Sequence, residues 1–235
     1  MKNDPVDAVP LLDALRATRP VPERPSDITA FWRSTLADLR DIDPDVASAV
    51  MRDADDPRIE ALSLYFRSLG GIRVRGYLLR WRDESPRPLV VHGHGYGSRY
   101  DMRWDWARRG LNVAGFDARG FGRSRGGVAL HPDGYVLTGI EAPQTSILRG
   151  AVCDLRRTVE VAVSLLPGMP TRRLVCGRSF SGGLACLAEG AGSFVDMLIA
   201  AVPTFGWAEG RRQLVRGGSG GEINRYLASH PQLDG

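Results

Sequence analysis

Two serines at the end of an apolar run are the residues whose placement points most directly to chemistry. The run from Leu174 to Cys176 leads through Gly177 to Ser179, and Ser181 follows two positions later. A buried strand that turns sharply into a helix places a serine at the apex of the turn, where its hydroxyl can attack a carbonyl carbon. Such a tight turn needs small neighbours, and Gly177 supplies one of them. The spacing therefore predicts Ser179 as the nucleophile of an acyl transfer.

Two other interpretations of this segment stay open. Ser181 could itself be the nucleophile, but it would then lie inside the first helical turn, where it is better explained as a small residue at the start of a helix. Both serines could also simply cap the helix, because serine is a preferred N-cap residue. The pattern Gly-x-Ser-x-Ser departs from the usual Gly-x-Ser-x-Gly, so the motif alone is a weak signal.

A glycine-rich stretch earlier in the chain could supply a backbone donor to the site of the serine. The segment from Val90 to Gly97 runs from a strand into a loop with glycine at 93, 95 and 97. Hydrolases with a serine turn place a backbone N–H from such a loop at the oxyanion that forms during attack. We expect Tyr96 to give this N–H and Phe180, the residue after the serine, to give the second. His94 and Gly95 belong to the same loop and are expected to support it.

Rival interpretations of this loop fail on spacing. A dinucleotide-binding fingerprint would need glycine at position 98, where Ser98 stands, and a phosphate-binding P-loop needs a lysine that the region lacks. His92 and His94 could lie on one side of a strand as metal ligands, but no third ligand is evident. We therefore expect no metal at this loop, which also matches neither nucleotide-binding motif.

A third charged stretch follows the next strand. Asp117 and Arg119 stand there beside glycines at 120 and 122. A carboxylate and a guanidinium together in a glycine-rich loop suit a structural clamp near the active-site face. We expect these two residues to support the site, without a catalytic role.

Composition excludes several other classes of protein. The net charge of +4 comes almost entirely from arginine, because Lys2 is the only lysine, and the basic residues are mixed with acidic ones. No basic run is dense enough to predict nucleic-acid binding. No apolar run is long enough to span a bilayer, and residues 1–20 lack the apolar stretch of a signal peptide. The three cysteines have no metal-ligand spacing and lie in apolar stretches, which is typical of reduced, buried thiols in a cytoplasmic protein.

Strands and helices must position these motifs, and the apolar pattern predicts them in order. Ser26 is expected to cap a first helix, and 41–57 is expected to form an acidic linker. Two β-rich runs, 59–69 and 72–81, are joined by Gly70-Gly71, a strong hairpin signal. The pattern then alternates, with strands at 89–91, 111–116, 174–176 and 197–202 and with helices near 102–108, at 148–166 and from about 181.

This order predicts one α/β domain. An antiparallel hairpin followed by strand–helix units implies a mixed, mostly parallel sheet with helices on both faces. We expect a helical extension and linker at 1–57 and the α/β domain at 58–235. The uninterrupted apolar run 197–202 has the composition of a strand buried on both faces. It is expected to be the last strand, and therefore an unpaired edge.

Taken in order, these motifs resemble the signature blocks of the acetyl xylan esterase and cephalosporin C deacetylase family, which has the α/β-hydrolase fold. The resemblance implies a serine esterase that removes acetyl groups from decorated sugars or similar small molecules, and a cytoplasmic homo-oligomer without an organic cofactor. It rests on His94-Gly95-Tyr96, Asp117-x-Arg119-Gly120-x-Gly122, Ser179 with Gly182-Gly183, Phe31-Trp32, Gly76–Leu79, Gly134-Tyr135, the long helix and Val202-Pro203.

Near the site the sequence departs from the family pattern at three positions. The family usually has glutamine where this chain has Phe121, and glutamine then glycine where it has Phe180 and Ser181. Phe180 can still give its backbone N–H. The side chain of Ser181 crowds the turn.

The larger departure concerns the end of the family pattern, where two further strands carry a triad aspartate and then a histidine. After Val202-Pro203 this sequence has a glycine-rich linker, a short helix near 222–229 and the stretch 231–235, so we expect these strands to be missing. His230 is expected to be a surface histidine, and His131 has the wrong chain order. Without a base, the chain alone is expected to be a poor esterase. The alternatives are an inactive, truncated hydrolase domain that serves for interaction, and a small-molecule binding module that uses the same pocket.

Overall fold

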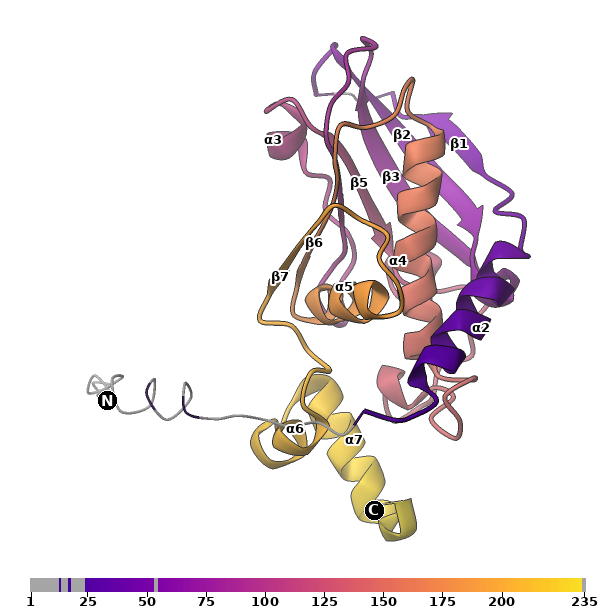
Figure 1. Ribbon diagram of the computed structural model, residues 1–235, viewed down its shortest axis with the longest axis vertical. Coiled ribbons are helices and arrows are strands. Elements are labelled where there is room, and N and C mark those ends of the chain that lie inside the picture. Colours follow the sequence, from indigo (N-terminus) through magenta and orange to yellow (C-terminus); the bar gives the residue numbers. More distant parts are fainter. Residues whose placement is uncertain (1–12, 14–16, 18–23, 53–54, 234–235) are drawn as a thin grey trace.

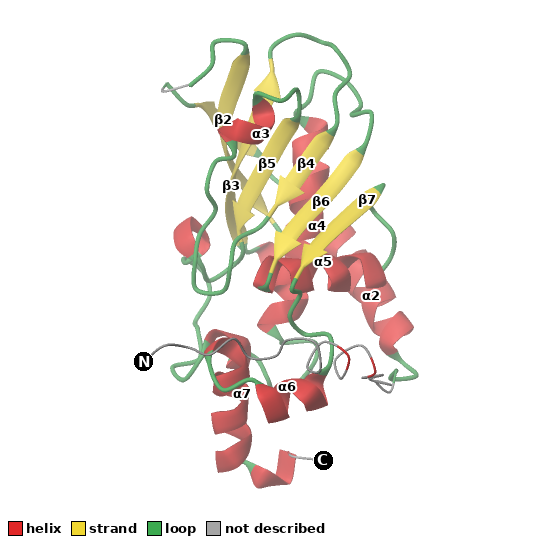
Figure 2. Ribbon diagram, turned by 90° about the vertical axis from the view of Figure 1, so that its left-hand side faces the viewer, coloured by secondary structure: helices red, strands yellow, loops and turns green. Residues whose placement is uncertain are grey.

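A seven-stranded mixed sheet forms the centre of the molecule (Figures 1 and 2). The computed structural model describes residues 13, 17, 24–52 and 55–233. The sheet has the order β1-β2-β3-β5-β4-β6-β7; the strands up to β5 pair antiparallel, and β5, β4, β6 and β7 run parallel. The strands are β1 (Ala47–Val50), β2 (Ile59–Arg67), β3 (Arg73–Trp81), β4 (Leu89–His92), β5 (Asn112–Asp117), β6 (Arg173–Arg178) and β7 (Met197–Ala201).

The predicted hairpin is confirmed. β2 and β3 pair over their full lengths, from Ile59 opposite Trp81 to Arg67 opposite Arg73. Gly70 and Gly71 in the connection have φ angles of 71° and 72°, a left-handed backbone that glycine adopts without steric cost.

The expected linker at 41–57 is wrong in one respect, because strand β1 lies within it and pairs with β2. All four side chains of β1 are exposed. An edge strand without a buried face leaves no alternation of apolar and polar residues in the sequence, so the pattern could not reveal it. The division of the chain at residue 57 stays a proposal.

Helices cover the two faces of the sheet unequally (Figure 1). The helices α2 (Ile28–Arg40), α4 (Ile147–Ser164) and α5 (Phe180–Gly190) lie on one face, and the single turn α3 (Trp104–Ala107) lies on the other. Alternate side chains of β2 point to opposite faces of the sheet. Leu62 and Leu64 join the core beneath α4, whereas Ala61 joins the core beneath α3. The first helix begins after Asp27, not after the predicted cap Ser26, and no side chain caps it.

Two further helices extend the chain beyond the carboxyl ends of the parallel strands (Figure 2). They are α6 (Ala208–Leu214) and α7 (Gly218–Ser229), followed by a short 3₁₀ turn at Pro231–Leu233. The sequence predicts α7 but treats the region of α6 as a glycine-rich linker, which the structure corrects. Loops that leave β4, β5, β6 and β7 end on this side, so the predicted site residues converge there.

β7 is the edge strand that the sequence predicts. Met197 and Ile199, however, are 54% and 50% exposed, so the expected burial on both faces is wrong. α5 contacts β7 from one face, and within the described chain no helix covers the other face at this edge. An exposed apolar edge therefore runs along one side of the molecule.

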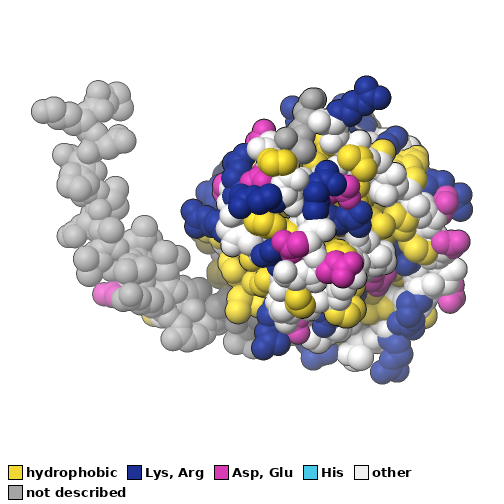
Figure 3. All heavy atoms as spheres, turned by 90° about the horizontal axis from the view of Figure 1, so that it is seen from above, with side chains coloured by type: hydrophobic (Ala, Val, Ile, Leu, Met, Phe, Trp, Pro, Cys, Tyr) yellow, Lys and Arg dark blue, Asp and Glu magenta, His cyan; other side chains and the backbone are white. Residues whose placement is uncertain are grey.

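The surface carries charges of both signs. Seen from the end opposite α6 and α7, basic and acidic side chains lie interspersed with apolar ones, without a continuous field of one sign (Figure 3). In the described part of the chain, no helix combines the length and the apolar character that crossing a membrane requires.

Candidate active site

Ser179 lies at a strained turn between β6 and α5. Its φ of 55° and ψ of −113° are unusual for a residue with a side chain. The turn is held on both sides: the Ser179 N–H donates to the Ala201 carbonyl over 2.9 Å, and the Ser179 carbonyl accepts from the Gly183 N–H over 2.9 Å. Strain that the surroundings enforce in this way is typical of functional positions.

The predicted need for a small residue at 177 has a direct steric cause. A Cβ at Gly177 would lie 2.4 Å from the backbone carbon and oxygen of Ser181. Backbone atoms in the first turn of a helix cannot move aside without breaking that turn. Gly183 is constrained likewise, because its Cβ would lie 2.4 Å from the Thr204 carbonyl oxygen. These glycines let α5 start immediately beside the strands.

The side chain of Ser181 is buried and bonded to the backbone of the turn. It is only 4% exposed, and its hydroxyl accepts from the Arg178 N–H over 3.1 Å and donates to the Arg178 carbonyl over 3.2 Å. Its Cβ occupies the space beside Gly93, where another Cβ would come within 2.6 Å. The crowding that the sequence predicts is therefore relieved by a glycine on β4's loop. This geometry favours Ser179 over Ser181 as the reactive residue.

His94 fixes the loop that follows β4. Its Nε2 accepts from the Ala118 N–H over 3.0 Å, so Nδ1 carries the proton and donates to the Gly95 carbonyl over 2.8 Å. Burial lowers the pKa of His94, which keeps the ring neutral and preserves this arrangement. His94 thus ties the loop after β4 to the end of β5. A Cβ at Gly95 would face open space.

Aromatic rings pack beneath the turn and join Tyr96 to Phe180. The centroids of these two rings lie 5.7 Å apart, edge to face. Phe121 contacts Phe180 at 5.5 Å and stacks on Tyr135 at 4.0 Å. Two of the three departures from the family pattern, Phe121 and Phe180, therefore contact each other, and an apolar aromatic pair stands where the family usually has two glutamines. The N–H of Phe180, in the first turn of α5, has no acceptor within the helix.

Asp117 and Arg119 each hold loops in place, but they do not pair with each other. Asp117 is fully buried and accepts from the N–H groups of Tyr100 and Arg123, each over 2.7 Å. Arg119 instead pairs with Asp154 on α4, at 2.7 Å and 3.0 Å, and donates to the Leu69 carbonyl. The first carboxylate shapes the loops beside the site, and the guanidinium ties the loop after β5 to α4 and to the hairpin.

The sequence gives no sign that Glu222 belongs to this region. The Tyr96 hydroxyl donates to Glu222 Oε2 over 2.5 Å, and the Val136 N–H reaches the same oxygen at 3.4 Å. A Cβ at Gly134 would lie 2.3 Å from that oxygen. Burial, together with the hydrogen bond to Glu222, raises the pKa of Tyr96. Glu222 thereby fastens α7 to the loop after β4, from which Tyr96 is predicted to donate an oxyanion N–H.

All four histidines of the chain have partners away from Ser179. His92 Nε2 lies 2.6 Å from the Tyr77 hydroxyl, and His94 is used as described. His131 Nδ1 accepts from the Asp133 N–H over 3.2 Å, and His230 Nδ1 lies 2.9 Å from the Tyr226 carbonyl oxygen. Across the described chain, no three His, Cys, Asp or Glu side chains gather as metal ligands.

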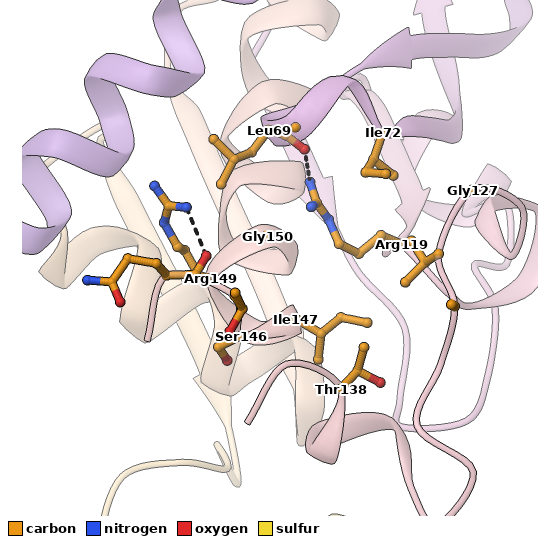
Figure 4. A pocket seen from close by; sticks show the side chains of 14 residues that line it. Leu69, Ile72, Arg119, Gly127, Thr138, Ser146, Ile147, Arg149 and Gly150 are labelled. Atoms are coloured by element: carbon orange, nitrogen blue, oxygen red, sulfur yellow. Dashed lines mark hydrogen bonds between the residues drawn. The ribbon is translucent and has the colours of Figure 1, made fainter. Parts of the chain in front are cut away.

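A separate cavity of about 330 Å³ lies between the hairpin and the start of α4 (Figure 4). Arg119 and Arg149 both line it. Each is already neutralised, the first by Asp154 and the second by Asp38 at 2.6 Å. The serine turn contributes nothing to this cavity, so we do not assign the chemistry to it.

A strained serine between a parallel strand and a helix, on a mixed sheet with helices on both faces, defines the α/β-hydrolase fold. The sequence model of the acetyl xylan esterase family matches residues 6–233, and the chain belongs to that family, whose members are carboxylic-ester deacetylases.

Two solved structures are similar over nearly the whole chain. Acetyl xylan esterase 1 from Thermoanaerobacterium sp. JW/SL YS485 has a TM-score of 0.82 and 21% identity, covering 92% of this chain and 71% of that protein. The acetyl xylan esterase from Paenibacillus sp. R4 also has a TM-score of 0.82, with 20% identity, covering 93% and 72%. At such identities the likeness establishes the fold, and it confirms the fold expected from the sequence.

Proposed function

We propose that this chain is a serine deacetylase of small acetyl esters, with acetylated sugars as the substrate class and Ser179 as the nucleophile. The observation that carries the proposal is the backbone of Ser179, held at φ 55° between β6 and α5. Membership of the acetyl xylan esterase family supports the substrate class.

In the proposed reaction, Ser179 Oγ forms a bond to the acetyl carbon and the carbonyl oxygen becomes an oxyanion. The backbone N–H groups of Tyr96 and Phe180 donate to that oxyanion, at the ends of two loops joined by ring packing. The bond to the alcohol oxygen then breaks, and the alcohol leaves with the proton of the serine hydroxyl. Water releases acetate from the acyl-enzyme by the reverse sequence.

This reaction needs a group that accepts the serine proton, and the four histidines are used elsewhere. Triad members act as a unit, so a serine without its base loses most of its advantage. The oxyanion hole and substrate binding alone would leave an acceleration of about a thousandfold over water. We therefore expect slow turnover of p-nitrophenyl acetate by this chain.

The second candidate is a non-catalytic binding domain, which the placement of the histidines favours. A fluorophosphonate probe tests the assignment of the nucleophile, with the adduct mapped by peptide mass spectrometry. We expect an adduct that forms slowly on Ser179, since no base activates it, and that is lost in Ser179→Ala and retained in Ser181→Ala. An adduct on Ser181 that survives Ser179→Ala would overturn the assignment, and the absence of any adduct would favour the binding domain.

We also propose that the protein works in the cytoplasm and forms homo-oligomers. Cys153, Cys176 and Cys186 are free thiols, which suits a reducing compartment, although only Cys153 has the expected burial and Cys186 is exposed. The exposed apolar edge at β7 supports self-association.

A further inference from the structure

A cavity of about 440 Å³ lies between α7 and the loop that carries His131. Its lining residues come from both segments and include His131, Asp133, Glu222, Arg225, Tyr226 and His230. Glu222 also binds the Tyr96 hydroxyl, so one wall of the cavity is attached directly to the loop after β4. The two histidines that the sequence leaves without a role thus line one cavity, and Glu222 in its wall binds the loop after β4.

Aromatic rings form a rigid flat wall in this cavity. Tyr226 and His230 stack with centroids 4.2 Å apart and planes 20° from parallel. His131 meets Tyr226 edge-on at 6.1 Å. The His230 ring is held in place, because its Nδ1 lies 2.9 Å from the Tyr226 carbonyl oxygen. Such rings present an apolar surface with polar edges.

The remaining lining groups are hydrogen-bonding ones of both kinds. Asp133 and Glu222 offer carboxylate acceptors, and Arg225 offers donors. The Asp133 side chain is 79% exposed, so its oxygens are open to a ligand. Two carboxylates disfavour a phosphate, and a flat ring wall does little for a metal ion. The combination suits a neutral ligand with apolar C–H faces and a rim of hydroxyl groups.

We propose that this cavity is a sugar-binding subsite, in which a pyranose ring packs on Tyr226 and its hydroxyls bind Asp133 and Arg225. This inference rests on the proposed function, because it assigns the subsite to the carbohydrate part of the acetylated substrate. The bond between Glu222 and Tyr96 sets the position of the subsite relative to the loop after β4. Recognition of the sugar is thereby kept apart from the serine chemistry.

Binding of unacetylated xylobiose tests the subsite without any turnover. The measurement is saturation-transfer NMR on the full chain and on Ser179→Ala, with about 10 mM disaccharide, since single-sugar contacts are weak. We expect transfer to the sugar protons with both proteins. Tyr226→Ala should weaken binding about fivefold, because it removes the stacking surface. Tyr226→Phe keeps the ring and should bind about as well as the natural chain.

Leu227→Ala is the matched control, because Leu227 lies on α7 but lines a different cavity. It should leave xylobiose binding unchanged. Should Tyr226→Ala fail to fold, Asp133→Asn at the exposed side chain provides the second variant and should weaken binding about threefold. Absence of transfer to xylobiose, or equal transfer in Tyr226→Ala and Asp133→Asn, overturns the subsite. Transfer that persists while fluorophosphonate leaves Ser179 unlabelled supports the subsite and counts against the proposed reaction.

Discussion

The Tyr96 hydroxyl and the Glu222 carboxylate lie 2.5 Å apart, although 126 residues separate them in the sequence. This bond connects the loop after β4 to α7 and places a charge beside the aromatic cluster. The position of α7 should therefore affect the conformation of the loop after β4, in which Tyr96 provides one of the two proposed N–H donors.

We expect Glu222→Gln to lower the free energy of unfolding by about 1 kcal/mol, because a neutral amide is a weaker acceptor than a carboxylate. Urea denaturation measures the change. Glu141→Gln is the control, since Glu141 is exposed in a turn outside any helix and should have no effect. Equal stability of the two variants would mean that the bond contributes nothing.

Glycines at the two ends of one strand–helix unit should respond in opposite ways to alanine. Gly177→Ala forces a Cβ against backbone atoms of Ser181 and should destabilise the fold by about 1–3 kcal/mol. Gly190→Ala, at the end of α5, meets nothing within 4 Å and should stabilise it by up to about 1 kcal/mol. Thermal and chemical unfolding of both variants give the comparison. Changes of the same sign would contradict the steric account of the turn.

Stability should depend on pH through His92. Burial lowers the pKa of His92 to about 4, so between this value and the ordinary 6.5 the unfolded chain binds more protons than the folded one. Stability is therefore complete above pH 6.5 and falls as the pH drops towards 4, by up to about 3 kcal/mol. His92→Gln should reduce this dependence in urea titrations at each pH, and His94, whose pKa burial also lowers, should account for part of what remains. The control is His131→Gln, which should keep the slope of the natural chain.

The exposed edge at β7 should promote self-association, because unpaired strand groups lie there beside apolar side chains. Sedimentation velocity at several concentrations is expected to detect oligomers, and Ile199→Lys should shift them towards monomer. Met169→Lys changes a residue that is 72% exposed in a loop and should not. A monomer at every concentration, with β7 amides strongly protected from exchange, would refute the edge argument.

The parts of the fold that the sequence could predict are those written in local patterns. The Gly70-Gly71 turn, the apolar runs and the Gly177–Ser179 spacing each lie within a few residues, and all appear in the structure where they are expected. β1 escaped detection because its four side chains are exposed. The residue pattern within one strand cannot show that no helix covers the face that carries Met197 and Ile199.

For the same reason, the sequence could not predict site contacts between distant segments. Asp117 and Arg119 stand two residues apart and suggest a pair, yet the guanidinium finds Asp154 on α4. The strand ends at Asp117, so the alternation that would place residues two apart on one face stops there, and tertiary packing selects their partners. Glu222 carries no motif at all, and its role follows only from the docking of α7.

The sheet contains both antiparallel and parallel strand pairs, and the two kinds should form at different stages of folding. β2 and β3 are joined by a short turn, whereas β4 must find β6 across a chain segment that includes all of α4. Closing such a long loop costs entropy before any contact forms, so parallel pairings arise slowly. The hairpin should therefore assemble early, and the turn at Ser179 should acquire its shape only when β6 settles beside β4. Protection of the β6 and α5 amides from exchange, followed by pulse labelling after dilution from denaturant, would then time the last step of folding.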